Sequence, residues 1–127
     1  LIAQAAALVL LARRLPRLRG PLLVRALAGG ALAFASAAGI AVAPGGRRVY
    51  VSNGGAGSVT VIDPATHLVV ATIAVGQRPW NMAFNADGSR LYVANGRSDS
   101  VSVIDTALNQ VVDTIAVGKR PWGVAIR

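Results

Sequence analysis

The feature that most constrains this chain is a repeat of 42 residues without insertions. One copy begins at Arg48 and reads RVYVSNGGAGSVTVIDPATHLVVATIAVGQRPW; the next begins at Arg90 and reads RLYVANGRSDSVSVIDTALNQVVDTIAVGKRPW. A further copy opens at Gly123 with GVAI and stops at Arg127. Periods of about 40 to 50 residues are typical of propeller blades and of helical arrays. The chain therefore uses one supersecondary unit more than once.

The alternation within each copy favours strands over helices. The segments VYVSN, SVTVID and VVATIAV are short, rich in Val, Ile and Thr, and close to period two, which is the strand pattern. Between them, NGGAG, DPATH and NADG combine the Asn, Gly, Pro and Asp of tight turns. The expected strands cover residues 40–43, 48–53, 58–63, 68–75, 82–85, 90–95, 100–105 and 110–117, and a further unit would open with a strand at 123–126.

Four strands in each unit predict an all-β fold of four-stranded antiparallel β-propeller blades. We assign one blade to residues 39–80, a second to 81–122 and the start of another to 123–127. Two blades form an incomplete ring, and repeats of this kind need neighbours on both faces. The remaining blades or self-association are therefore expected to complete the fold, and the isolated piece should be marginally stable.

Residues 1–38 differ from the repeats in composition. They are mostly Ala, Leu, Gly and Arg, with five arginines and no acid, and so supply five of the eight net positive charges. A secretory signal consists of a basic stretch, an apolar run and a cleavage site of small residues. The leader has all three, with its apolar run over 26–38 and possible cleavage sites such as AFA (33–35). This predicts a periplasmic or extracellular protein that meets the membrane only through its leader. A retained membrane anchor and a wrongly assigned start in GC-rich coding DNA are the alternatives.

Composition also excludes several classes of function. The absence of cysteine removes disulfides, thiolate metal sites, covalent haem attachment and cysteine nucleophiles. A nucleic-acid footprint should cluster on the folded domain, whereas most of the excess charge lies in the leader, so no nucleic-acid partner is expected. The single histidine, His67, falls in an expected turn and cannot form a two-histidine metal site. No metal and no other cofactor is predicted.

The five aspartates do not form a catalytic set in the sequence. A general acid–base pair needs two titratable groups in one pocket. Asp63 and Asp105 end the third strand of each copy and are interpreted as turn caps, and Asp87 belongs to the β-turn NADG. Asp113 lies within a strand. No catalytic residue is assigned, and the question of enzyme activity stays open.

The second strands carry a family motif. YVSN (50–53) and YVAN (92–95), followed by SVTVID or SVSVID and then TIAVG, resemble the YVTN family of β-propeller repeats over residues 40–127. Ser and Ala replace the Thr of the motif. The resemblance implies a propeller, commonly seven-bladed, in exported bacterial or archaeal proteins. Members include surface-layer proteins, periplasmic binding or scaffold proteins, lactonase-like enzymes and propellers beside pyrroloquinoline-quinone-dependent oxidation systems.

Both tryptophans of the chain lie in one recurring pentapeptide, GQRPW (76–80) and GKRPW (118–122). It connects the last strand of one blade with the first strand of the next. As a joint, its Gly would allow the chain to turn, its Trp would fill the wedge between blades, and its Arg would bond loop carbonyls of the adjacent blade. As a site, Arg and Trp at the channel mouth would bind an anionic or planar aromatic ligand through charge and stacking.

The loop at 96–99 adds a charged pair that the first copy lacks, because Arg97 and Asp99 correspond to Gly55 and Gly57. The sequence therefore predicts an exported propeller module that binds an unidentified protein or a small anionic or aromatic ligand at its channel-face loops. A fragment of a lactonase-like or quinone-oxidation-associated propeller and a structural surface-layer repeat are the alternatives. The candidate ligand-binding residues are Arg78, Trp80, Arg97, Asp99, Arg120 and Trp122.

Overall fold

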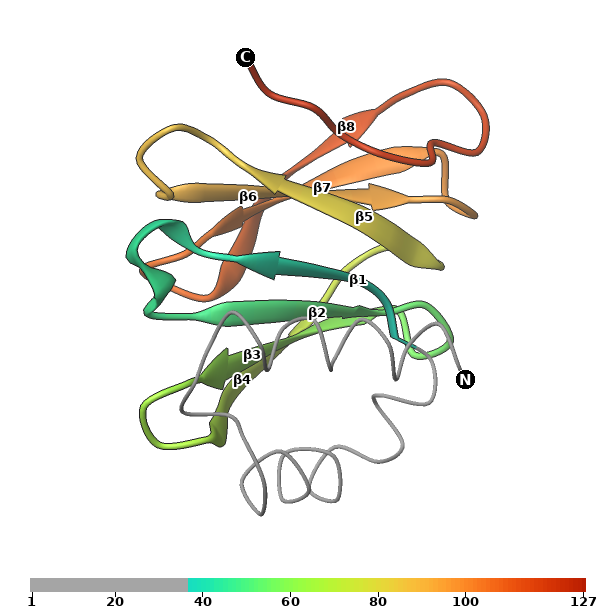
Figure 1. Ribbon diagram of the computed structural model, residues 1–127. Helices are drawn as coiled ribbons and strands as arrows, with labels where there is room; N and C mark the ends of the chain where they lie inside the picture. The colour runs from blue at the N-terminus through green and yellow to red at the C-terminus, as the bar shows by residue number, and fades with distance from the viewer. Residues whose placement is uncertain (1–36) are drawn as a thin grey trace.

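The computed structural model describes residues 37–127, which form two four-stranded antiparallel sheets (Figure 1). The first sheet contains β1 (Ala37–Val42), β2 (Val49–Asn53), β3 (Ser58–Asp63) and β4 (Leu68–Ala74). The second contains β5 (Pro79–Phe84), β6 (Arg90–Asn95), β7 (Ser100–Asp105) and β8 (Gln110–Ala116). A 3₁₀ turn, η2 (Pro44–Gly46), follows β1. In each sheet, strands adjacent in sequence are also adjacent in space, which confirms the all-β blade architecture.

Three of the predicted strands, 58–63, 90–95 and 100–105, have the predicted bounds. The inner strands β1 and β5 each begin three residues earlier than predicted, because Ala37 pairs with Asn53 and Pro79 pairs with Asn95 across an irregularity in register. The predicted strand at 123–126 is wrong, since residues 121–127 form no strand. A strand needs a pairing partner, and the repeat would place that partner after Arg127.

The described part of the chain contains no helix long and apolar enough to cross a membrane. The predicted leader has its arginines and most of its apolar run outside the described residues.

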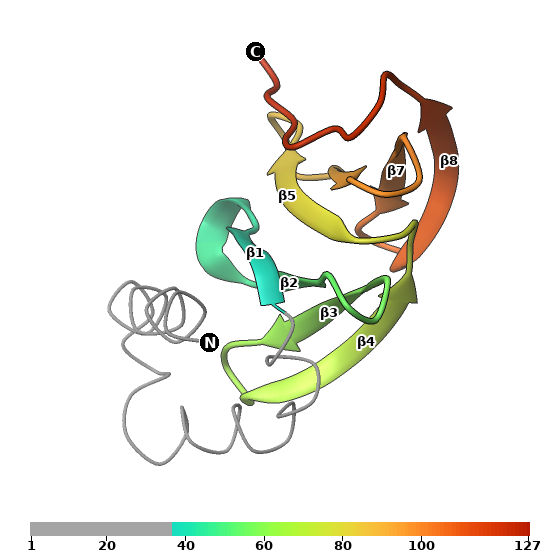
Figure 2. The ribbon, with the colours of Figure 1, turned by 90° about the vertical axis from the view of Figure 1, so that its right-hand side faces the viewer.

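The apolar core lies between the two stacked sheets (Figures 1 and 2). Its fully buried members come equally from both sheets, because burying the facing surfaces removes apolar area from water. Tyr50 lies edge-on to Phe84 of the other sheet, with ring centroids 5.3 Å apart. The inner strands β1 and β5 lie against each other. The core cluster consists of Tyr50, Val59, Val61, Ile73, Met82, Leu91, Val93 and Ile104.

The asparagine of the motif has the same structural role in both copies. Asn53 is buried, and its Nδ2 donates to Ser58 Oγ at 3.1 Å and to Thr60 Oγ1 at 2.9 Å. Asn95 donates to the hydroxyl groups five and seven residues later at 3.1 and 2.9 Å. These bonds satisfy the amide nitrogen of each Asn and fix the end of the second strand against the third, whereas Oδ1 of each Asn is buried without a hydrogen-bond partner among the described residues.

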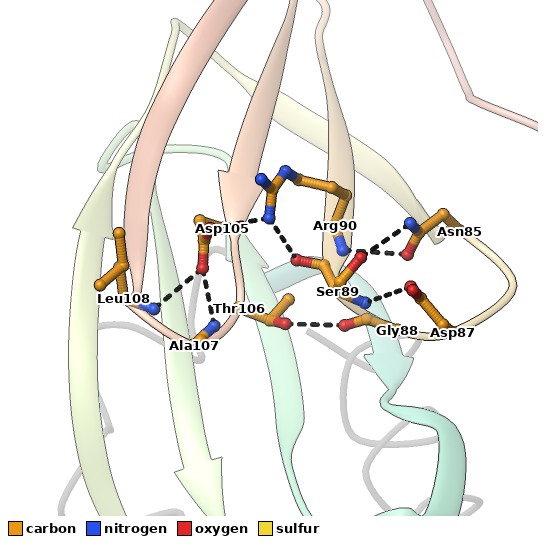
Figure 3. A network of polar contacts seen from close by, with 9 residues as sticks. All are labelled: Asn85, Asp87, Gly88, Ser89, Arg90, Asp105, Thr106, Ala107 and Leu108. Carbon is orange, nitrogen blue, oxygen red and sulfur yellow. Dashed lines mark hydrogen bonds and ion pairs between the residues drawn. The ribbon is translucent and has the colours of Figure 1, made fainter.

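The predicted turn caps are confirmed at the end of each third strand. In the second copy Asp105 Oδ1 accepts hydrogen bonds from the backbone N–H of Leu108 at 3.0 Å and of Ala107 at 2.9 Å, while Oδ2 lies 2.7 Å from Arg90 (Figure 3). The N–H of Leu108, then that of Ala107 and the charge of Arg90, hold the pKa of Asp105 below its ordinary value. Asp63 caps its own turn in the same way through the N–H of Ala65.

The β5–β6 turn completes this polar network. Asp87 Oδ1 accepts the backbone N–H of Ser89 at 2.9 Å, and hydrogen bonds from Ser89 lower the pKa of Asp87. Thr106 donates its hydroxyl to the carbonyl of Gly88 at 2.7 Å, which ties the β5–β6 turn to the β7–β8 turn (Figure 3). The aspartates at this end of the sheet therefore stabilise the turns.

Candidate functional site

The two pentapeptides share an unusual backbone conformation at their arginine. Arg78 and Arg120 have φ values of 52° and 53°, a left-handed conformation that is uncommon outside glycine. The chain bends over 76–78 and 118–120 as predicted, but the left-handed residue of the bend is the Arg and not Gly76. Gly76 instead permits close packing, because a Cβ there would lie 2.5 Å from Cγ of Asn95.

The β6–β7 loop (96–99) binds the first pentapeptide through backbone groups. Gly96 N–H donates to the carbonyl of Arg78 at 2.9 Å, and Arg97 N–H donates to the carbonyl of Gln77 at 3.0 Å. The N–H of Gln77 donates in turn to Ser98 Oγ at 3.0 Å. Within residues 37–127 the guanidinium group of Arg78 bonds no loop carbonyl, so that part of the joint prediction is wrong for Arg78. The corresponding bonds of Arg120 would go to a following blade and stay a prediction. The backbone holds the joint and leaves the arginine side chains free for other contacts.

The same loop also binds the second pentapeptide. Asp99 Oδ1 accepts the backbone N–H of Arg120 at 2.8 Å, and the carbonyl of Asp99 accepts the N–H of Val117 at 3.0 Å. Asp99 itself has a φ of 49°. The β6–β7 loop is therefore a bridge between the two pentapeptides.

The tryptophans meet beside this bridge. The ring centroids of Trp80 and Trp122 are 5.1 Å apart with the planes tilted by 44°. The indole of Trp80 packs so closely on Gly96 that a Cβ there would collide with it, and the guanidinium carbon of Arg78 lies 5.5 Å from the Trp80 ring centroid. The Trp80 ring is half-buried and lies outside the core cluster between the two sheets. The carbonyl of Trp80 links the sheets, accepting the hydroxyl of Ser52 at 2.6 Å.

These elements enclose an open hollow of about 690 Å³. All six predicted site residues line this hollow, beside residues that the sequence analysis did not identify. The complete lining is Gln77, Arg78, Trp80, Gly96, Arg97, Asp99, Lys119, Arg120, Pro121 and Trp122.

The lining is strongly cationic. Four basic side chains against the single carboxylate of Asp99 give it a net charge of +3. The ion pairs found in the described chain are Arg48–Asp63 and Arg90–Asp105, and neither lies in the hollow. The basic groups of the hollow therefore have no carboxylate partner among residues 37–127.

Gln77, Gly96, Lys119 and Pro121 are the lining residues that the sequence did not single out. Gln77, Lys119 and Pro121 belong to the pentapeptides, so their repetition was the available signal. Gly96 carried only a turn signal, because the closeness of its backbone to the Trp80 indole depends on the tertiary arrangement.

The hollow is chemically suited to binding. The exposed Trp122 indole offers a flat face for stacking, and guanidinium groups without a carboxylate partner bind carboxylate, sulfate or phosphate by charge-assisted hydrogen bonds. Asp99 is the only acid in the lining, and its carboxylate already accepts a backbone N–H. Across 37–127 no three residues among His, Asp and Glu lie close enough together to hold a metal ion.

The stacked four-stranded meanders, with a shared site at the loops that join them, define a β-propeller protein. The chain belongs to the lactonase, seven-bladed β-propeller family, whose model matches residues 17–120. The match begins inside the segment predicted as a leader. A search of curated proteins found no match.

Several solved structures are similar to this chain. Hydrazine synthase from Kuenenia stuttgartiensis is 39% identical with a TM-score of 0.67, and the alignment covers 69% of this chain and 25% of that one. The dihydro-haem d1 dehydrogenase NirN, in complex with DHE, is 27% identical with a TM-score of 0.58, covering 64% and 18%. A functionally unknown protein from Desulfotomaculum acetoxidans DSM 771, at 23% identity, TM-score 0.65 and coverage of 72% and 32%, supports the fold alone. The chain thus spans a third or less of each of these proteins.

Proposed function

We propose that this chain is a ligand-binding part of an exported propeller protein, and that its hollow takes a small anionic aromatic ligand or an anionic group of a protein partner. The observation that carries the proposal is the set of basic side chains without carboxylate partners beside two indole rings. A set of like charges in one concave site attracts anions and repels cations.

The size and chemistry of the hollow support a small ligand. Small-molecule sites are commonly about 300 to 1,000 Å³, and the hollow of about 690 Å³ lies within that range. Trp122 is 72% exposed in this chain, whereas its counterpart Trp80 is half-buried against Gly96 and Trp122 of the next copy. NirN, of which this chain covers 18%, was solved in complex with DHE.

The proposal also includes export of the protein and neighbouring blades that complete the fold. The arginine cluster and the apolar run of residues 1–38 support a secretory signal and a periplasmic or extracellular location. The YVSN and YVAN motifs support an assignment to YVTN repeats, and the 42-residue period supports further blades of the same kind as neighbours of this piece.

A lactonase-like enzyme is the second candidate, and the family match favours it. Opening a lactone ring produces a hydroxy acid, whose carboxylate the cationic hollow would bind. Fold and family do not by themselves determine activity, and other blades would have to supply the catalytic groups. Hydrolysis of a simple lactone by the full-length protein, unchanged by Arg78→Ala, would favour an active centre elsewhere in the ring.

Arg78→Ala and Arg120→Ala test the proposed binding site. In the full-length protein we expect each variant to weaken binding of naphthalene-1,5-disulfonate about tenfold or more, because each removes a charge-assisted contact. The free energy of unfolding should change by no more than about 1 kcal/mol, since exposed charges contribute little. Arg47→Ala is the control, because Arg47 is exposed before β2, at the opposite end of the strands. Large destabilisation with unchanged binding would make the pentapeptide a joint only.

A further inference from the structure

The β2–β3 and β6–β7 loops have the same length and nearly the same backbone but different chemistry. Gly57 and Asp99, which are equivalent in the repeat, have φ values of 64° and 49°. The first loop has glycine at both of the positions where the second has Arg97 and Asp99. Glycine at these two positions is sufficient to form the turn in the first copy. Asp99 adopts a left-handed conformation that glycine adopts at lower cost in free energy. The fold therefore does not require the two charges.

The first pentapeptide reaches the same arginine conformation without an aspartate. Gly57, the counterpart of Asp99, has no side chain to bond Arg78, and Arg78 is held through its carbonyl by the N–H of Gly96, yet its φ equals that of Arg120 to within a degree. What the Asp99 bond adds is a fixed distance between the second pentapeptide and the loop. That bond holds Lys119 and Arg120 on the rim of the hollow to which Arg97 also belongs.

Resting on the proposed function, we propose that the β6–β7 loop makes this hollow selective for an aromatic ligand that carries two or more anionic groups. Arg97 contacts the ligand, and Asp99 is a positioning residue that acts through Arg120. The lining of the hollow has a charge of +3. A bound monoanion would leave two of these positive charges uncompensated, whereas a dianion or trianion would compensate most or all of them. Charge complementarity of this kind determines specificity more than it does raw affinity.

Two probes with the same ring test this selectivity: naphthalene-1,5-disulfonate and naphthalene-1-sulfonate, titrated by calorimetry against the full-length protein. The wild type should bind the disulfonate at least about tenfold more tightly than the monosulfonate. Arg97→Gly, which restores the residue of the first copy, should weaken disulfonate binding about tenfold and monosulfonate binding less than about twofold. Arg97→Gln repeats the test while keeping a long side chain, and the unfolding midpoint of each variant confirms that it is folded.

Asp99 gives the sharper test, because its positioning role and its negative charge predict opposite changes in disulfonate affinity when it is replaced. Asp99→Gly removes a negative charge, so electrostatics alone would tighten disulfonate binding; loss of the Arg120 anchor should instead weaken it about fivefold or more. Asp99→Asn keeps the acceptor oxygen and tolerates the left-handed backbone, and should bind the disulfonate at least as well as the wild type. Tighter binding by Asp99→Gly would overturn the positioning role. An unchanged probe ratio in Arg97→Gly and Arg97→Gln would overturn the selectivity and leave the binding site standing, whereas failure of the wild type to bind either probe would overturn both.

Discussion

The two copies of the repeat are alike in local structure and different in environment. Both end the second strand with a buried Asn that bonds two hydroxyl groups, and both place Arg in the left-handed region before Pro. Yet Tyr50 is 1% exposed while its counterpart Tyr92 is only half-buried. A Cβ on Gly76 would collide with the next blade, whereas a Cβ on Gly118 would meet nothing within 4 Å.

This difference separates what a repeat encodes locally from what a neighbour supplies. Strand pairing, turn caps and the pentapeptide conformation follow from residues inside one copy. Burial of the blade face depends on the copy that follows, as expected for an architecture in which each repeat contacts only its neighbours. Identical residues in the two copies should therefore contribute unequally to the stability of the 127-residue chain.

The largest expected difference is between Tyr50→Ala and Tyr92→Ala. Tyr50 fills the space between the sheets and contacts Phe84, so its removal should cost about 3–5 kcal/mol of unfolding free energy. Tyr92→Ala should cost about 1 kcal/mol. Urea unfolding of both variants in the 127-residue chain measures the gap. Equal costs would contradict the neighbour argument, and in a longer protein with a following blade the two costs should converge.

Gly76→Ala and Gly118→Ala sharpen the comparison at the pentapeptide. The added methyl group at Gly76 would displace Asn95, which is already fixed by two hydrogen bonds, and should cost about 1–3 kcal/mol. Gly118→Ala should stay within about 0.5 kcal/mol. Thermal unfolding of the pair is the measurement. A neutral Gly76→Ala would show that the β4–β5 connection can move away from the β6–β7 loop at little cost.

The sequence predicted most of the fold, because strand alternation and turn chemistry are local. It placed β3, β6 and β7 at their observed bounds and assigned Asp63 and Asp105 to turn caps. It missed the early start of β1 and β5, where pairing continues through residues without alternation. It also predicted a strand at 123–126 that does not form, since local pattern carries no information about whether a partner strand is present.

The candidate site was predicted as a set of residues but not as a geometry. Repetition identified the Arg and Trp positions, and departure from repetition identified Arg97 and Asp99. The role of each group was not recoverable, because it depends on tertiary contacts. Only the structure shows that backbone groups tie the joint, that Asp99 binds the Arg120 N–H, and that the Trp80 ring lies on Gly96.

The smallest effect that we predict concerns acid. Asp105 has a pKa lowered in the folded chain by the N–H groups of Leu108 and Ala107 and by Arg90. A lowered folded-state pKa contributes stability that is present above the unfolded pKa of about 4 and is lost as pH falls through the folded value. Asp105→Asn should therefore reduce stability slightly at neutral pH and make its loss below pH of about 4 shallower.

Unfolding midpoints of wild type and Asp105→Asn between neutral pH and strongly acidic pH test this expectation. Asp113→Asn is the matched control, because it removes the same charge from an exposed position on β8 that has Ala71 as its counterpart in the first copy. If the control flattens the acid response as much as Asp105→Asn does, net charge rather than the turn cap causes the response. If only Asp105→Asn flattens it, the cap at the β7–β8 turn is a local feature of the copy. Its contribution then persists without a following blade, in contrast to that of the tyrosine and glycine positions.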